Sequence, residues 1–300
     1  MCNFEAFFIS IMGVNCTFSG HETFHCKSLW LKKGYDFVYA GRSFNDDDAV
    51  VELGVGKNMV ASIRYWLRAF GIIDNRGEIT EIGHYIFGDN GRDPFLEDVN
   101  TLWLLHYLLL STEYAVLYKQ VFFHLHKERQ TFTKTNIHSF IKRKIDDRAF
   151  AGIQYNETTI GRDIGVLLKN YVVPEGKTYE DFTAVLLDLN LIGRRKDDEN
   201  EKDKDVFYEF NYKTKAEINP LIFLYAVKDI AGDETIVDFD KLLNLALQFC
   251  LTQNDLYEIF RQLNKIDSNI SFSNVAGEQL FTIDENLTKT QILDMYYNNR

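Results

Sequence analysis

The chain of 300 residues is 46% hydrophobic and 26% charged, and its formal net charge is −11 at pH 7. These values are typical of a soluble globular protein with two or more domains, and they exclude one whose whole surface coats nucleic acid, although a local cationic patch can still bind it. No apolar run reaches the roughly 20 residues that cross a bilayer. Four irregularly spaced cysteines exclude a disulfide framework. We expect a cytoplasmic protein without membrane contact.

Residues 1–17 are predicted to be an N-terminal extension. The opening is apolar, but it carries Glu5 and no Lys or Arg, which is unlike a signal peptide. Met12 is therefore an alternative to Met1 as the native start, and the sequence leaves that choice open.

Residues 18–126 are predicted to form a winged-helix-like domain. Apolar residues recur at helical spacing on both sides of the Gly-Val-Gly turn at 54–56, and a polar turn at 75–77 precedes Thr80, which can cap a further helix. That order of elements is typical of a winged helix-turn-helix. The expected segments are helices at Ser28–Val38, Asp48–Leu53 and Lys57–Phe70, an extended Ile72–Ile73 and a helix from Glu81, with Asn45–Asp48 offering N-terminal acceptors.

The second helix of this unit carries a cationic stripe. Lys57, Ala61, Arg64 and Arg68 are spaced 4, 3 and 4 residues apart, so they share one helical face. In a helix-turn-helix this helix enters the major groove of DNA. The predicted DNA contacts are Lys57, Asn58, Ser62, Arg64, Arg68 and Arg76. The alternative is that both arginines pair with acids such as Glu52 or Glu81, while Tyr65 and Trp66 belong to the core.

The middle of the chain is helical and then basic. Residues 94–126 are a helical region, and Thr101–Leu110 is apolar almost all round, which predicts a buried helix. A basic linker or helix follows at 127–155, because residues 127–148 hold seven cations against three acids. Such a run either tracks a nucleic-acid backbone or is a solvated face.

Two further units are predicted toward the C-terminus. Residues 156–230 resemble a second winged-helix unit, but its loop 197–205 has six acids and two lysines, so this unit favours protein contact over DNA. Residues 231–300 form a helical unit with a small hairpin. The expected elements are helices at Thr158–Tyr171 and Phe182–Ile192, a strand at Val206–Tyr212, helices at Asp238–Phe249 and Thr252–Leu263, strands at Ile270–Ser273 and Gln279–Ile283, and a helix at Lys289–Tyr297. The fold class is mainly α with small β-hairpins (α+β).

Several blocks of this sequence resemble the bacterial family called domain of unknown function 4007. They are FSGHETF at Phe18–Phe24, the helix-turn-helix block with Gly-Val-Gly-Lys-Asn-Met inside Val51–Asp74, DPFLEDVNTLWLLHYLL at Asp93–Leu109, and AGEQLFTIDE at Ala276–Glu285. The resemblance implies no assigned activity. It implies a place near phosphorothioate-type DNA modification and phage-defence genes.

Catalytic and metal motifs are weak in this chain. The Gly-Lys pair at 56–57 lacks the earlier Gly and the following Ser or Thr of a phosphate-binding loop. Cys16, His21, His25 and Cys26 do not have the spacing of a zinc finger. His21 and Glu22 form a polar cluster that could act in acid–base chemistry, but no nucleophile accompanies them. The structural alternative is that His21 bonds a backbone carbonyl and Glu22 pairs with a lysine.

These observations predict a non-enzymatic, duplex-DNA-binding component of a bacterial defence or DNA-modification system, without cofactor or metal. The alternative is a protein–protein adaptor of such an assembly that does not contact DNA. A catalytic subunit using His21 and Glu22 is the least favoured interpretation.

Overall fold

The computed structural model describes residues 18–147, 150, 154–195, 206–212, 218–275 and 278–300. The N-terminal extension with its two alternative starts, Cys16, and the acidic loop at 197–205 lie outside the described residues. The chain divides into two compact units, residues 1–210 and 211–300. This division falls inside the span 156–230 that was assigned to a single unit from the sequence.

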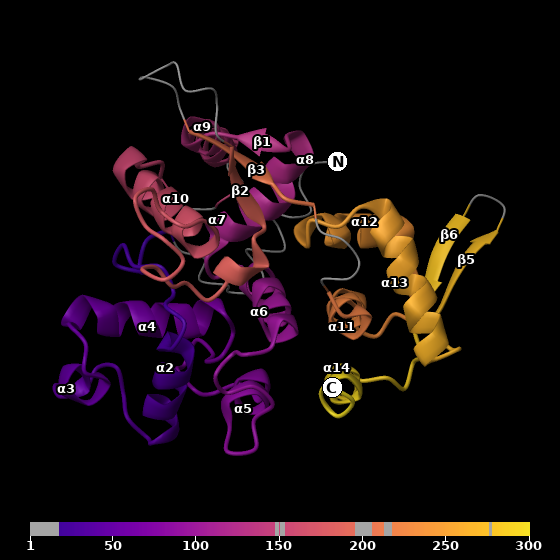
Figure 1. Cartoon of the computed structure of the whole chain (residues 1–300), viewed down its shortest axis with the longest axis horizontal. Helices are drawn as coiled ribbons and strands as arrows, with labels where there is room; N and C mark the ends of the chain where they lie inside the picture. The colour runs from indigo at the N-terminus through magenta and orange to yellow at the C-terminus, as the bar shows by residue number, and fades with distance from the viewer. Residues whose placement is uncertain (1–17, 148–149, 151–153, 196–205, 213–217, 276–277) are drawn as a thin grey trace. The chain divides into compact units, whose positions relative to one another are not determined.

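The first unit begins with three helices, which follow one another in the order that the sequence predicts (Figure 1). They are α2 (Trp30–Tyr39), α3 (Ala49–Leu53) and α4 (Lys57–Ala69). Gly54 ends α3 in a left-handed conformation, with φ 58° and ψ 36°, which a glycine adopts without steric cost. The sharp turn lets α4 start only three residues later, at Lys57. Beneath it, Phe37, Ala49, Leu53 and Val60 form a small buried core.

Helices α2 and α4 approach closely because α2 contains a glycine at the crossing. A Cβ on Gly34 would lie 2.7 Å from Cγ2 of Ile63 and 2.7 Å from Cδ1 of Leu67, both fully buried. No other residue type fits there without a shift of this core. The position of α4 is therefore fixed by its inner face, while Lys57, Asn58 and Ala61 of its outer face are exposed.

A minimal hairpin follows α4. Ile73 and Ile79 form an isolated antiparallel bridge, and the Asp74 carboxylate accepts hydrogen bonds from the backbone N–H groups of Arg76 and Glu78 at 2.8 and 2.9 Å. The Thr80 hydroxyl oxygen then accepts from the backbone N–H of Gly83 at 3.2 Å, which caps α5 (Glu81–Phe87). The predicted extended segment, turn and capped helix are confirmed.

The helix α6 (Val99–Ser111) lies in the interior of the first unit. Its residues 101–110 are all buried, as predicted for an apolar helix without a polar face. A continuous helical stretch follows, and its middle turn is a π-helix. The further helices are α7 (Val116–Lys119), η1 (Gln120–Leu125), α8 (His126–Glu128), α9 (Lys134–Asp146) and α10 (Glu157–Tyr171).

An antiparallel sheet completes the first unit. Its strands are β1 (Thr131–Phe132), β2 (Ile192–Arg195) and β3 (Phe207–Phe210), in the order β1-β3-β2. The strand predicted at Val206–Tyr212 is confirmed by β3, and its register pairs Tyr208 with Phe132 on one side and Arg194 on the other.

The predicted helix at Phe182–Ile192 is wrong. The segment contains only the short 3-10 helix η2 (Leu187–Leu189), and Asn190 has φ 46° before β2 begins. The backbone N–H of Val185 donates to the Cys26 carbonyl at 3.0 Å, so it is not available to a helix. Most side chains from 184 to 192 are buried and only Asp188 and Asn190 are exposed, so the segment has no clear helical periodicity.

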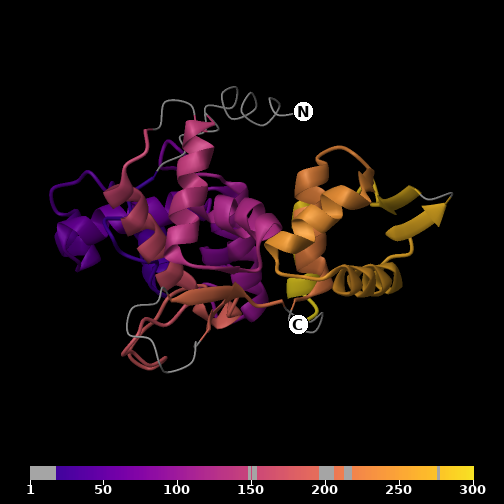
Figure 2. The same cartoon turned by 90° about the horizontal axis from the view of Figure 1, so that it is seen from above.

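The second unit contains helices and a second three-stranded antiparallel sheet, of order β4-β6-β5. Its hairpin of β5 and β6 lies beside α13, where Phe260 stacks on Phe281 with ring centroids 4.4 Å apart (Figures 1 and 2). Thr252 caps α13 in a reciprocal capping box, at the start of the helix that the sequence predicts at Thr252–Leu263. The elements are α11 (Pro220–Ala231), β4 (Ile236–Asp238), α12 (Phe239–Gln248), α13 (Gln253–Ile266), β5 (Ser271–Val275), β6 (Glu278–Thr282) and α14 (Lys289–Tyr297).

The described residues thus form a mainly helical protein with two small antiparallel sheets, which confirms that part of the predicted fold class. No helix among them is both long and apolar enough to span a bilayer.

Candidate nucleic-acid interface

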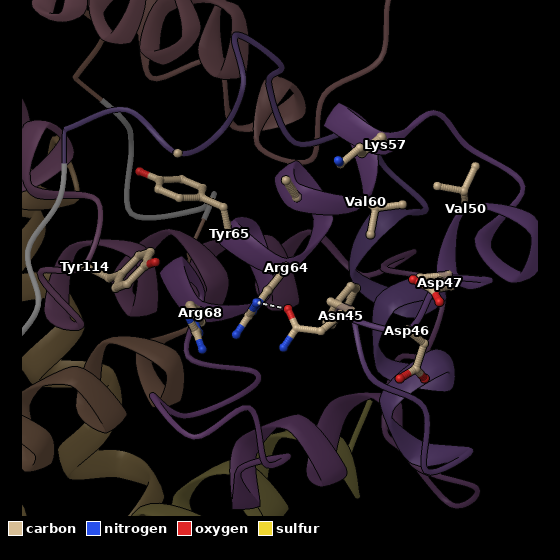
Figure 3. A pocket seen from close by; sticks show the side chains of 14 residues that line it. Asn45, Asp46, Asp47, Val50, Lys57, Val60, Arg64, Tyr65, Arg68 and Tyr114 are labelled. Atoms are coloured by element: carbon tan, nitrogen blue, oxygen red, sulfur yellow. Dashed lines mark hydrogen bonds between the residues drawn. The ribbon is translucent and has the colours of Figure 1, made fainter.

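The cationic stripe of α4 lines a single pocket. Lys57, Ala61, Arg64 and Arg68 all border a cavity of about 650 Å³. The loop at 44–47 borders the same cavity, as do Gly20 and Tyr114. Figure 3 shows Arg64 and Arg68 side by side, with Lys57 farther along α4. The helical spacing seen in the sequence therefore corresponds to one concave surface.

The two arginines are held by neutral oxygen atoms. Arg64 Nη1 donates to Asn45 Oδ1 at 3.0 Å, and Arg68 Nη2 donates to the Asn75 carbonyl oxygen at 3.1 Å (Figure 3 marks the first bond). Among the described residues neither arginine forms an ion pair with a carboxylate. The predicted alternative, pairing with Glu52 or Glu81, is wrong in the described part of the chain. Glu52 instead lies 3.1 Å from Arg42.

The two positively charged arginines also repel each other. Partial burial, followed by the nearby charge of Arg68, lowers the pKa of the Arg64 guanidinium from its usual value. Arginine side chains are cationic at neutral pH. Two adjacent cations without a carboxylate attract an anion, which would relieve their repulsion.

The opposite wall of the pocket has different chemistry. Asp46 and Asp47 are exposed acids in the loop before α3, and Val50 and Val60 add apolar surface. In Figure 3 the two aspartates lie beyond Asn45, and Tyr114 lies beside Arg68. The pocket is thus cationic and aromatic at one end and acidic at the other.

The other predicted DNA contacts differ in their exposure to solvent. Asn58 is exposed at the start of α4, and Arg76 is exposed in the turn of the hairpin that follows. Ser62 is fully buried, and its hydroxyl has no hydrogen-bond partner among the described residues. Ser62 therefore lies in the core beneath the stripe. Tyr65 and Trp66 are buried too, as predicted.

His21 lies in a buried contact that sequence spacing does not reveal. Its Nε2 is 3.0 Å from the Asp163 carboxylate of α10, and both side chains are almost fully buried. Its Nδ1 accepts from the backbone N–H of Thr23 at 3.2 Å, and its ring stacks on Trp66 with centroids 6.1 Å apart. The expected backbone carbonyl partner is therefore wrong, because the partner is a carboxylate.

The loop around His21 has an unusual backbone. Ser19, Glu22 and Thr23 all have positive φ, at 71°, 47° and 67°, and Gly20 has φ 108°. Such conformations persist where surrounding contacts fix them. Ser19 N–H donates to Asp163 at 2.8 Å, and Cys26 N–H donates to Asn170 at 3.0 Å, each across 144 residues. The Gly-His-Glu-Thr-Phe block is thus a docking loop on α10, with Glu22 exposed at its surface.

The basic run after residue 126 contains the helix α9. Its Arg143 pairs with Glu128, while Lys127 lies 4.0 Å from the centroid of the Phe123 ring. Burial, followed by the charges of Lys144, Lys119 and Lys127, lowers the pKa of His124 to about 4. The predicted "linker or helix" is in this part a helix.

The cysteine cluster does not assemble a metal site in the described part of the chain. Cys26 is a buried free thiol, and burial raises its pKa well above the usual value. His25 Nε2 bonds to the Thr183 carbonyl at 2.9 Å. No group of three or more His, Cys, Asp or Glu side chains able to hold a metal ion occurs among the described residues.

Three pocket or docking residues escape prediction from the sequence. Asn45 is the hydrogen-bond partner of Arg64, Tyr114 lines the same pocket as Arg64, and Asp163 is the partner of His21. Asn45 was expected only as a helix-capping acceptor. Tyr114 and Asp163 come from segments distant in the sequence, and one signal was available for Asp163: an acid on the buried side of an amphipathic helix usually has a buried partner.

Comparisons with known proteins give two kinds of match. A family model described as "Protein of unknown function (DUF4007)" matches residues 18–297. No curated protein matches the chain. Among solved structures, the magnesium ion-bound SspB crystal structure is 24% identical with a TM-score of 0.82, and another SspB crystal structure is 25% identical with a TM-score of 0.81. Each alignment covers 94% of this chain and 88% of the other.

Proposed function

The chain belongs to the DUF4007 family of proteins of unknown function, and from this membership we propose that it is a non-enzymatic, DNA-binding component of a bacterial defence or DNA-modification system. Its likeness to SspB across nearly the whole of both chains supports a shared fold. In this proposal α4 is the recognition helix of a winged helix-turn-helix, and its stripe contacts duplex DNA.

One observation carries the proposal. The three cations of the stripe face one pocket, and the two arginines have no carboxylate partner among the described residues. A cation that an acid has already neutralised gains little from a phosphate, whereas an arginine bonded only to neutral oxygen keeps its full charge for one.

The surroundings of α4 support the same proposal. The helix follows a three-residue turn from α3, and a short hairpin with exposed Arg76 at its turn follows α4. A wing in that position contacts the DNA backbone beside the groove that the recognition helix enters. The apolar face of α4 is fully used in packing, so DNA binding requires no rearrangement of the core.

A binding role without catalysis is supported by the state of His21. Its side chain is almost fully buried between Asp163 and Trp66, so a substrate has no access to it.

An adaptor role is the second candidate, and exposed apolar side chains favour it. Val51 on α3 is 78% exposed, and Leu29 just before α2 is 62% exposed. Apolar groups on a helix-turn-helix surface are typical of protein contacts rather than of phosphate contacts.

The test is fluorescence anisotropy with a random-sequence duplex of about 20 base pairs at 50 and 200 mM salt. Three phosphate contacts predict a slope of log affinity against log salt of about −2.7, and therefore about a 40-fold loss between these concentrations. Arg64→Ala/Arg68→Ala should make the slope shallower by about 1.8 without lowering the melting temperature.

The matched control is Lys241→Ala/Arg261→Ala, which removes two exposed cations from the second unit. It should leave the slope unchanged. No binding by the native chain at 50 mM salt, or equal slopes for the two double variants, would overturn the DNA proposal. Capture of a protein partner that is lost on Val51→Asp would then support the adaptor.

A further inference from the structure

The pocket on α4 has more room and more varied chemistry than a contact with a DNA phosphate requires. We propose that it is a nucleotide site, in which Arg64 and Arg68 bind the phosphate and Tyr114 contacts the base of one nucleotide unit. The inference rests on the proposed function in one respect, namely that the arginines bind phosphate. It adds the identity of the group that fills the rest of the pocket.

The size of the pocket is the first argument. Its volume of about 650 Å³ lies within the range of small-molecule sites, roughly 300 to 1,000 Å³. A phosphate bound to the arginines alone would leave most of that volume to water. Partial burial of Arg64 also places the charge inside the cavity, where a group must enter to reach it.

The acidic wall is the second argument. Asp46 and Asp47 repel a phosphate, so a pocket built for phosphate alone would not include them. Carboxylates accept hydrogen bonds from amino and hydroxyl groups, which nucleotide bases and sugars provide. Asp46 uses one oxygen to accept from the Ser43 backbone N–H at 2.9 Å. Its other oxygen has no partner among the described residues.

Tyr114 supplies the aromatic surface. It lies against Tyr65 with ring centroids 5.3 Å apart, and the residue before it, Glu113, has φ 54° and pairs with Lys119. The backbone is therefore held in a conformation that places this ring at the pocket. Aromatic side chains bind bases of any sequence by stacking.

Arg68 provides the final observation. Its Nε is buried and has no hydrogen-bond partner among the described residues, although Nη2 is bonded to Asn75. Buried donors of this kind are rarely left without an acceptor. A phosphate oxygen would supply the acceptor if the Arg68 side chain turned this N–H toward the pocket.

Isothermal titration of the full chain tests the site with three probes: inorganic phosphate, deoxyadenosine and deoxyadenosine monophosphate. The monophosphate should bind at least ten-fold tighter than either of the others. Tyr114→Leu should lower the affinity for the monophosphate by about 5- to 150-fold, which is the range that base stacking provides, and leave the affinity for inorganic phosphate unchanged. Tyr114→Phe should retain native affinity because it keeps the ring, and Tyr179→Leu, at an exposed tyrosine, is the matched control.

Two sources can provide the nucleotide. If it is part of DNA, a duplex with a one-nucleotide overhang should bind about ten-fold tighter than a blunt duplex, and Tyr114→Leu should abolish that difference. Equal binding of both duplexes, with tight binding of the monophosphate, identifies a free nucleotide. Either result supports the site.

Equal affinities for phosphate and the monophosphate, or unchanged monophosphate affinity in Tyr114→Leu, would overturn the nucleotide site. If blunt duplex binding still depends on Arg64 and Arg68, the DNA proposal stands alone. Tyr114-dependent binding of the monophosphate without duplex binding at 50 mM salt would keep the site and overturn the DNA proposal.

Discussion

Nε2 of His21 lies 3.0 Å from a carboxylate oxygen of Asp163, and this buried contact joins the N-terminal block to α10. The second oxygen of Asp163 accepts from Ser19 N–H at 2.8 Å. Nδ1 of His21 accepts from Thr23 N–H, so the ring proton lies on Nε2 and faces Asp163, although the first oxygen lacks the alignment of a hydrogen bond. The contact thus fixes the loop through burial and polar contact.

Asp163→Ala should destabilise the protein by about 3 kcal/mol, because it leaves a buried imidazole and a backbone N–H without their acceptor. Chemical denaturation measures the change. Asp36→Ala is the control, since its partner Lys32 forms an exposed pair and the cost should stay below about 1 kcal/mol. Similar losses for the two variants would show that the His21 contact does not fix the loop.

Gly34→Ala should destabilise the first unit by about 1–3 kcal/mol, because the added methyl meets Ile63 and Leu67 at 2.7 Å. Gly165→Ala is the matched control within another helix, where a Cβ has nothing within 4 Å. Gly165→Ala should stabilise the protein by up to about 1 kcal/mol through its higher helix propensity. Thermal melts of both variants check the contrast, and equal changes in melting temperature would rule out close packing at Gly34.

Stability should fall as pH decreases from about 7 to 4, with His124 as one cause. Its pKa is lowered to about 4 in the folded protein from 6.5 when unfolded, so between these values the unfolded chain binds the extra proton. Proton binding to the unfolded state favours unfolding. His124→Gln should reduce this loss by about 1 kcal/mol or more.

A nuclear magnetic resonance titration of the His124 ring checks the cause directly. The midpoint should lie near 4 and rise in Lys144→Gln, because burial is the larger cause of the lowered pKa and Lys144 the next. Lys134→Gln removes an exposed lysine at the start of α9 and should have less effect. A midpoint near 6.5 in the native protein would contradict the prediction.

Arg76→Ala should weaken binding of a random duplex several-fold and make the salt slope shallower by about 0.9, if the hairpin turn contacts one phosphate as a wing. Glu78→Ala in the same hairpin should not weaken binding, since it removes a negative charge. Anisotropy at two salt concentrations separates the two variants. An unchanged slope in Arg76→Ala would remove the hairpin from the interface.

Local patterns predicted most elements around the pocket. The 4, 3, 4 spacing places Lys57, Arg64 and Arg68 on one face whatever the rest of the fold, and Gly54 determines where α3 must end. Spacing cannot show which polar residue on an amphipathic helix faces inward at its edge. Ser62 was therefore included among the DNA contacts, although its side chain is fully buried.

Contacts between distant segments could not be predicted. The Asn45–Arg64 bond and the His21–Asp163 contact both depend on how loops dock after the helices have packed. The prediction of a helix at 182–192 is wrong for a related reason. The backbone N–H of Val185 donates to the carbonyl oxygen of Cys26, which is 159 residues earlier in the chain. No local propensity encodes such a bond.

The long-range bonds of the N-terminal block also have a consequence for biosynthesis. Ser19 and Cys26 have acceptors 144 residues farther along the chain. At about 5–20 residues per second on the ribosome, those acceptors are synthesised roughly 7 to 30 seconds after the block itself. The loop that contains Ser19 and Cys26 therefore cannot form these two bonds until α10 has been synthesised.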